Sequence, residues 1–251
     1  MSLFAEFRKE WTYLIRSYRF LIAAVVLLFF GLTSPVLARY QEELMNAIPT
    51  GGITITMPPA TVMTAIGQYA KNMAQDAVLL GLLLTMGAIA IEKDKGTAAM
   101  MLVKPLPRGS FLMAKFLSLA VMFACCLAIA GLAAYYYTYL LFQAMNFADW
   151  LALNAFVFVY LLVIVSVTLF CSTVTRSQGA AIGIAFALLV IGWFAGGILR
   201  LGEFMPGELV TWGMRLMQGN TTPSWVALGV SLGLIVVPLL AAGMIFKRQE
   251  L

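Results

Sequence analysis

Six long runs of apolar residues alternate along the chain with shorter stretches in which charged residues, proline and glycine gather. About 20 apolar residues in a helix span the hydrocarbon layer of a membrane. The runs lack strict alternation of apolar and polar residues, which excludes the strands of a transmembrane barrel and predicts helices. The expected spans cover residues 20–37, 77–91, 111–141, 150–171, 179–199 and 224–246. The sequence therefore predicts an all-α integral membrane protein with six transmembrane helices.

Residues 1–19 precede the first run, and their apolar residues recur at helical spacing. One face carries Phe4, Phe7, Trp11, Leu14, Ile15 and Tyr18, and the other carries Glu6, Arg8, Lys9, Glu10, Arg16 and Arg19. Such an amphipathic helix lies in the membrane interface, with its aromatic face toward the acyl chains. A simple membrane anchor and a helix that packs near a partner protein both fit this pattern.

Two longer polar stretches, 38–76 and 200–223, are expected on the same side of the membrane. In the first, a helical pattern resumes at Ala60 and is expected to run into the second span without a break. The second is amphipathic, and Pro206 and Gly207 divide it into two short pieces. Whether the first stretch caps a transport pathway or is a plain loop stays open.

Composition supports a membrane protein and narrows its chemistry. The chain is 62% hydrophobic and 11% charged, and its mean hydropathy is +0.94. It has no histidine, and its three cysteines lie in predicted spans, where we interpret them as small buried hydrophobes. The sequence has no phosphate-binding loop and no familiar metal or catalytic motif, so we expect neither an enzyme nor a bound cofactor. No predicted span carries a charged residue at its centre, so an ion-coupling group is not expected either.

The most densely charged stretch, 92–115, lies between the second and third runs. Gly96 is expected to end the preceding helix, and residues 97–103 then form a short helix that Pro105 and Pro107 terminate. Its apolar face comprises Met100, Met101 and Leu102. A short helix held at the membrane surface suits the docking of a soluble partner. The alternative is an ordinary basic loop that fixes the topology.

The distribution of Lys and Arg predicts the orientation. Of the 16 such residues, those expected outside the cell are Arg39, Lys71, Arg200 and Arg215. The others concentrate at the opposite side, as the positive-inside rule requires of cytoplasmic segments. They sit at span ends, where they meet anionic lipid, so the net charge of +5 does not indicate nucleic acid binding. We expect a multi-pass protein of a bacterial or archaeal plasma membrane with both termini in the cytoplasm.

The fifth run contains two pairs of glycines, Gly179 with Gly183 and Gly192 with Gly196. Small residues at this spacing allow two membrane helices to approach closely. The contact is either between helices of one chain or between two chains. Arg176, in the short turn before this run, is a candidate for a second and smaller docking point.

The 92–115 stretch resembles the loop between the second and third spans of ABC-type-2 exporter permeases. The matching residues are Glu92, Gly96, Thr97, Lys104, Pro105, Arg108 and Lys115. With the six-span layout, the resemblance covers essentially the whole chain. It implies that the loop forms a cytoplasmic coupling helix, which sits in a cleft of a separate ATP-binding-cassette ATPase, and that residues 1–19 form an elbow helix. It also implies a contact between chains at the fifth span and short helices that re-enter the outer leaflet at 200–223.

We therefore expect a permease subunit of an ATP-binding-cassette exporter for a hydrophobic or amphipathic drug, lipid or peptide, with ATP and Mg²⁺ bound by the partner subunit. The residues expected to contact the ATPase are Glu92, Gly96, Thr97, Met100, Met101, Leu102, Lys104, Pro105, Arg108 and Arg176. The alternatives are a stand-alone secondary carrier or channel, and a structural or immunity protein that transports nothing. The sequence does not indicate the cargo, nor whether the second permease chain is identical or related.

Overall fold

The computed structural model describes residues 3–46, 59–94, 108–142, 145–175, 177–198 and 201–248, and within these ranges the regular structure is helical. Six helical segments are long and apolar enough to cross a membrane. They cover Arg19–Arg39, Val62–Lys93, Gly109–Leu141, Phe147–Val174, Gln178–Ile198 and Trp225–Phe246. The predicted all-α fold with six membrane-spanning helices is confirmed.

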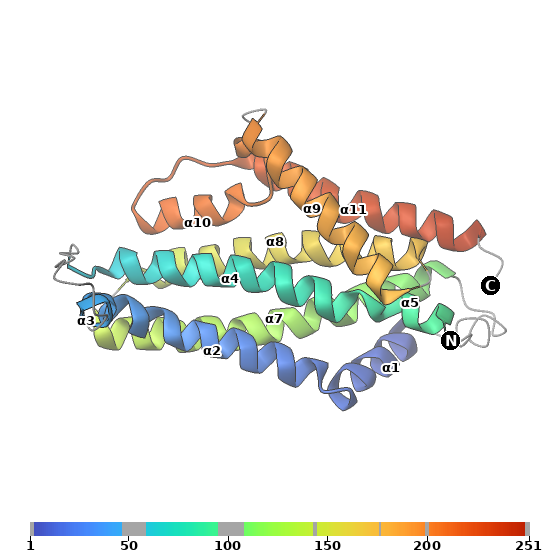
Figure 1. Ribbon diagram of the computed structural model, residues 1–251, viewed down its shortest axis with the longest axis horizontal. Coiled ribbons are helices and arrows are strands. Elements are labelled where there is room, and N and C mark those ends of the chain that lie inside the picture. Colours follow the sequence, from blue (N-terminus) through green and yellow to red (C-terminus); the bar gives the residue numbers. More distant parts are fainter. Residues whose placement is uncertain are drawn as a thin grey trace.

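The helices in chain order are α1 (Leu3–Arg16), α2 (Arg19–Arg39), α3 (Gln41–Asn46), α4 (Val62–Thr85), α5 (Gly87–Asp94), α7 (Arg108–Leu141), α8 (Phe147–Val174), α9 (Gln178–Ile198), the 3₁₀ helix η1 (Gly202–Phe204), α10 (Glu208–Met217) and α11 (Trp225–Arg248). The helices α2, α4, α7 and α8 run side by side along the long axis (Figure 1). At one end lie α1, α5 and the last turn of α11, and at the other lie α3 and α10 (Figure 1). We call these the α5 end and the α3 end.

The core is built around α8, which packs against α4, α9, α10 and α11 as well as α7. Its side chains Leu153, Val157, Leu161 and Ile164 are almost completely buried and recur at helical spacing. In contrast, α9 and α11 leave most of their side chains exposed. Membrane helices on the outside of a bundle keep apolar exposed faces because lipid surrounds them.

The helix α4 begins at Val62 because Thr61 caps it. The Thr61 hydroxyl accepts a hydrogen bond from the Thr64 amide at 3.3 Å, and the Thr64 hydroxyl accepts one from the Thr61 amide at 3.3 Å. The helix then runs into the second span, as predicted. Because the span is longer than residues 77–91, it includes Asp76, which is 7% exposed. No charged residue lies within the predicted residues 77–91, but Asp76, just before them, lies near the middle of the longer segment.

Pro238 interrupts the hydrogen-bond ladder of α11, as its position predicts. Proline has no backbone N–H, so the carbonyl of Leu234, four residues earlier, loses its partner within the helix. The hydroxyl of Ser166 on α8 lies 3.0 Å from this oxygen and 2.9 Å from the Val163 carbonyl oxygen of its own helix, so its one hydrogen is shared between the two acceptors. A neighbouring helix thus satisfies the freed carbonyl, which lipid cannot do.

The helix α10 follows the predicted division at Pro206 and Gly207 and lies along α8 at the α3 end (Figure 1). The ring of Trp212 stacks on Phe156 with 4.4 Å between centroids. Gly213 sits so close to α8 that a Cβ atom on it would lie 2.9 Å from the Cα atom of Leu153. The contact between α10 and α8 therefore depends on a missing side chain.

Replacing Gly213 with Val is expected to push α10 away from α8, because the Leu153 backbone cannot move aside. Overpacking of this kind costs about 1–3 kcal/mol. For a chain of this size that lowers the melting temperature by a few degrees, which tryptophan fluorescence during heating of the purified protein measures. The matched control is Gly229→Ala on α11, where a Cβ atom meets nothing within 4 Å. Equal melting temperatures for G213V and the control would contradict the close packing of α10.

Candidate functional site: an ion cluster at the α5 end

The helix α1 turns an acidic face toward the bundle. Glu6, Glu10 and Leu14 are buried, whereas Phe4 and Ile15 are exposed. The helix lies where the apolar period predicts one, but Glu6 and Glu10, which belong to its predicted polar face, are buried against the bundle. The spacing of apolar residues distinguishes the apolar face of a helix from its polar face. It does not show that a lysine of a distant helix pairs with Glu10 and allows this face to be buried.

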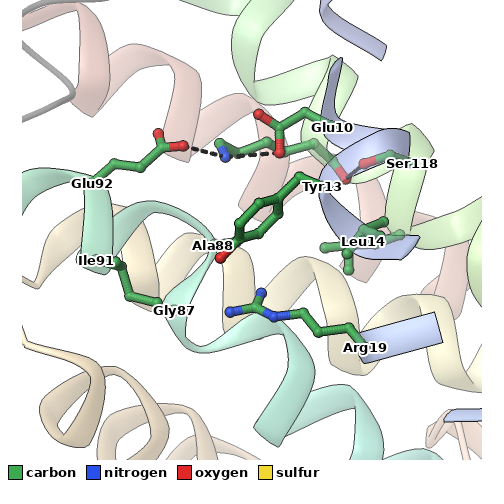
Figure 2. A pocket seen from close by; sticks show the side chains of 11 residues that line it. Glu10, Tyr13, Leu14, Arg19, Gly87, Ala88, Ile91, Glu92 and Ser118 are labelled. Atoms are coloured by element: carbon green, nitrogen blue, oxygen red, sulfur yellow. Dashed lines mark hydrogen bonds and ion pairs between the residues drawn. The ribbon is translucent and has the colours of Figure 1, made fainter. Parts of the chain in front are cut away.

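That cation is Lys115, in the second turn of α7. Its Nζ atom lies 3.0 Å from Oε2 of Glu10 and 2.9 Å from Oε1 of Glu92. The Lys115 side chain is 4% exposed, and those of Glu10 and Glu92 are 8% and 19% exposed. Figure 2 shows the two carboxyl groups reaching the ammonium from opposite sides. We call Glu10, Glu92 and Lys115 the ion cluster.

Neighbouring groups complete the environment of the ion cluster. The ring of Phe111, one turn before Lys115, lies 4.9 Å from the ammonium and stabilises it through a cation–π contact. Lys9 adds a second positive charge, 3.5 Å from both Glu6 and Glu10. The side chain of Lys9 is 41% exposed, so its contribution is screened by water and small.

The ion cluster joins three elements that are separate in the sequence. Glu10 comes from α1, Glu92 from α5 and Lys115 from α7. Glu92 precedes the 95–107 segment and Lys115 follows it, so the two helices that flank this segment are tied to each other. Since a buried charge must stay paired, α1, α5 and α7 are held together at one point.

Beside the ion cluster is a cavity of about 40 Å³, with room for about three water molecules. Figure 2 shows Tyr13 between the acidic groups and Arg19, which lies on the far side of the cavity. The guanidinium of Arg19 lies 5.3 Å from the Tyr13 ring centroid and donates to the Leu84 carbonyl at 3.2 Å. The cavity is too small for a drug-sized ligand, which needs a few hundred Å³.

The helix ladder is interrupted at Met86, between α4 and α5, and a side chain of α8 fills the interruption. The hydroxyl of Ser172 donates to the Met86 carbonyl at 2.8 Å and accepts from the amides of Ile89 and Ala90 at 3.1 and 3.0 Å. Lys93, at the other end of α5, donates to the carbonyl of Thr173. Hence α5 is bound to the last turns of α8 at both of its ends.

The predicted site residues fall into three groups. Glu92 lies in the ion cluster, and Arg108 begins α7. The residues Gly96, Thr97, Met100, Met101, Leu102, Lys104, Pro105 and Arg176 lie outside the described residues, so their contact with an ATPase stays a prediction. The four glycines lie on α9, where Gly179, Gly183 and Gly192 have open space around them and Gly196 meets Met205 of the same chain.

Three residues of the site were not predicted as site residues: Glu10, Lys115 and Ser172. A signal existed for Lys115, because it is a lone lysine inside the third apolar run. Glu10 and Ser172 gave no comparable signal, since a short acidic helix face and a serine near a span end are both ordinary. Among the described residues, no three His, Cys, Asp or Glu side chains are placed to hold a metal ion.

Comparison with known proteins agrees with the sequence pattern. A family model described as "ABC-2 family transporter protein" matches residues 5–251. A curated relative, the uncharacterized transmembrane protein YxlG of Bacillus subtilis strain 168, is 24% identical over 99% of this chain and 98% of its own length. The match to the family model extends over all six spans and the three positions of the ion cluster.

Replacing Lys115 with Met is expected to remove the buried cation that lies between the Glu10 and Glu92 carboxylates. Breaking a buried ion pair in this way costs about 3–5 kcal/mol. The triple variant Lys115→Met, Glu10→Gln, Glu92→Gln carries no such charges and should recover most of this loss. Melting temperatures of the purified proteins measure both effects. The control is Lys9→Met, with an expected change below about 1 kcal/mol. A triple variant less stable than K115M would contradict the assignment of the cluster.

Proposed function

The chain belongs to the ABC-2 family of transporter proteins, and from this premise we propose that it is the permease subunit of an ATP-binding-cassette exporter. It is a multi-pass transporter membrane protein with six spans. In the proposed complex, a separate ATPase subunit, which binds ATP and Mg²⁺, also binds the 95–107 segment. The proposal also places the α5 end in the cytoplasm, because the Lys and Arg residues concentrate there.

The observation that carries the proposal is the ion cluster. A loop that only connects two spans does not require its flanking helices to be fastened to each other. Here Glu92 before the 95–107 segment and Lys115 after it form an ion pair with 2.9 Å between Nζ and Oε1. Because the pair is largely buried, separating its members strands a charge at the membrane surface. The flanking helices therefore receive any displacement of the segment as one unit.

The proposed cycle follows from this connection. ATP closes two ATPase subunits on each other, and the 95–107 segment moves with the subunit that grips it. The ion cluster passes the movement to α5 and α7 together, and Glu10 makes α1 follow them. The spans tilt as a result, and cargo moves outward along the interface between two permease chains.

We place the contact with the second permease chain on α9. A Cβ atom on Gly179, Gly183 or Gly192 would meet nothing within 4 Å, so this helix has room for a close partner. The exposed side chains Trp193 and Ile198 extend the apolar face of the same helix. Gly196 is less suited to the contact, because Met205 of the same chain already covers it. The partner is a second copy or a related chain.

The cargo is proposed to be hydrophobic or amphipathic, such as a drug, a lipid or a peptide. The support is the character of the exposed faces of α9 and α11, which are apolar over most of their length. Strongly polar cargo would meet no matching surface on these helices.

The first test replaces Arg108 and Met101 with Glu in the same chain. Met101 belongs to the segment that is proposed to enter the ATPase cleft, and Arg108 directly follows it, so both changes put negative charge at the proposed contact and should abolish association with the ATPase. The chain is expressed with ATPase subunits encoded by neighbouring genes, and co-purification is measured by an affinity tag on the permease. Membrane insertion should be unchanged.

The control for this test is Lys71→Glu, which alters an exposed side chain of α4 that is proposed to lie outside the cell. It should leave co-purification intact. Equal recovery of the ATPase with the Arg108 and Met101 double variant and with the wild type would count against the proposed grip.

The second test concerns orientation. In a chain without its three native cysteines, single cysteines are placed at Glu42 and at Val174, which are exposed at the α3 end and the α5 end. A maleimide that does not cross membranes should label the cysteine at 42 in intact cells and the one at 174 only after the cells are opened. The reverse pattern would place the 95–107 segment outside the cell, where no ATPase reaches it.

A further inference from the structure

Ser172 uses its full hydrogen-bonding capacity at the break between α4 and α5. A hydroxyl group can donate one hydrogen bond and accept two. The side chain is fully buried, and its one donor goes to the Met86 carbonyl while its two acceptor sites take the Ile89 and Ala90 amides. All three partners belong to the second span, whereas Ser172 belongs to α8. The serine is therefore a cap supplied by a different helix.

The start of α5 needs such a cap. The first four amides of a helix have no carbonyl partner within it, and lipid offers none. In α5, Ile89 and Ala90 are the third and fourth residues, so Ser172 satisfies two of these four amides. An ordinary N-cap comes from the residue just before the helix, so it holds the helix relative to the segment that precedes it in the chain. This cap fixes α5 to α8 instead.

Two carbonyls at the end of α4 have partners outside α5. The amide of Met86 donates to the Leu82 carbonyl at 2.9 Å, and Arg19 on α2 donates to the Leu84 carbonyl at 3.2 Å. The Met86 carbonyl, at the break itself, is the one that Ser172 pairs. The break is thus a point where α5 can change direction relative to α4 while these hydrogen bonds remain.

We infer that Ser172 joins α5 and the last turns of α8 into one lever that pivots at Met86. The inference rests on the proposed function. A displacement of the 95–107 segment by the ATPase then reaches α8 through the Ser172 hydroxyl, rather than α4 through a continuous helix. Ser172 is a positioning residue, because it acts through α5.

The first arm of the test uses the purified chain alone. Ser172→Ala removes the cap with almost no change in volume, so the amides of Ile89 and Ala90 should exchange their hydrogens about tenfold faster. Ser172→Thr keeps a hydroxyl and should restore slow exchange. The matched control is Ser118→Ala, because the Ser118 hydroxyl is also buried but donates to the backbone carbonyl of Lys115 in its own helix. Exchange of the two amides should be unchanged in this control.

The second arm uses the complex with the ATPase. Spin labels on Leu83 of α4 and Val174 of α8, both exposed, report the distance between the two helices at the α5 end. Nucleotide should change this distance in the wild-type complex. In the Ser172→Ala complex the change should be lost, while binding of the ATPase and its basal hydrolysis of ATP remain.

The outcomes separate the inference from the proposed function. Unchanged amide exchange in Ser172→Ala would overturn the cap. Faster exchange with an undiminished nucleotide-driven distance change would overturn the lever and leave the ATPase coupling standing. If no ATPase associates with the wild-type chain, the proposed function fails, and the lever fails with it.

Discussion

A single buried cation organises the α5 end of the bundle. Lys115 belongs to an apolar helix and its side chain is buried in the bundle, where an unpaired charge costs several kcal/mol. Glu10 and Glu92 offset that cost, and each comes from a different element. The need to pair one charge therefore dictates where α1, α5 and α7 meet. An ion pair of this kind adds little to the net free energy of unfolding. It does raise the free energy of any arrangement in which the three elements are separated.

The backbone is under a related constraint, because hydrocarbon offers no hydrogen bonds to an interrupted helix. Interruptions of described spans occur at Pro35 of α2, at Met86 and at Pro238, and α8 supplies a serine to the last two. The Ser172 hydroxyl donates to the Met86 carbonyl at the break between α4 and α5. The Ser166 hydroxyl donates to the Leu234 carbonyl, which loses its partner within the helix because of Pro238. The central position of α8 in the core makes this arrangement available. The helix thus acts as the common support of its neighbours through polar contacts as well as through packing.

The sequence predicts most span boundaries well because apolar length is a direct physical requirement of the membrane. The first span was expected at 20–37 and covers Arg19–Arg39, and the fifth was expected at 179–199 and covers Gln178–Ile198. The second span was drawn too short because polar residues precede it. In the fold these include Asn72, which donates to Ser34 of α2 at 2.9 Å. Ser34 is distant from Asn72 in the sequence, and Lys115 is distant from Glu10. The local spacing of apolar residues contains no information about such long-range pairs. Glu92 was named because its neighbours in sequence form a recognisable motif, but as a contact of the ATPase, which stays a prediction, and its pairing with Lys115 was not predicted.

Polar contacts are unevenly distributed over the bundle, and this bears on where it can move. At the α3 end, Tyr69 donates to Asn154 at 2.5 Å and joins α4 to α8, while Asn72 joins α4 to α2. At the α5 end, the ion cluster and Ser172 tie α1, α5, α7 and α8. In the described part of the chain, no side-chain hydrogen bond or ion pair joins α9 to another helix. Apolar contacts in lipid are easily exchanged for contacts with lipid or with another chain. The contacts along α9 are therefore of the kind that exchanges most readily, which supports the proposed contact with a second chain independently of the spacing of the glycines.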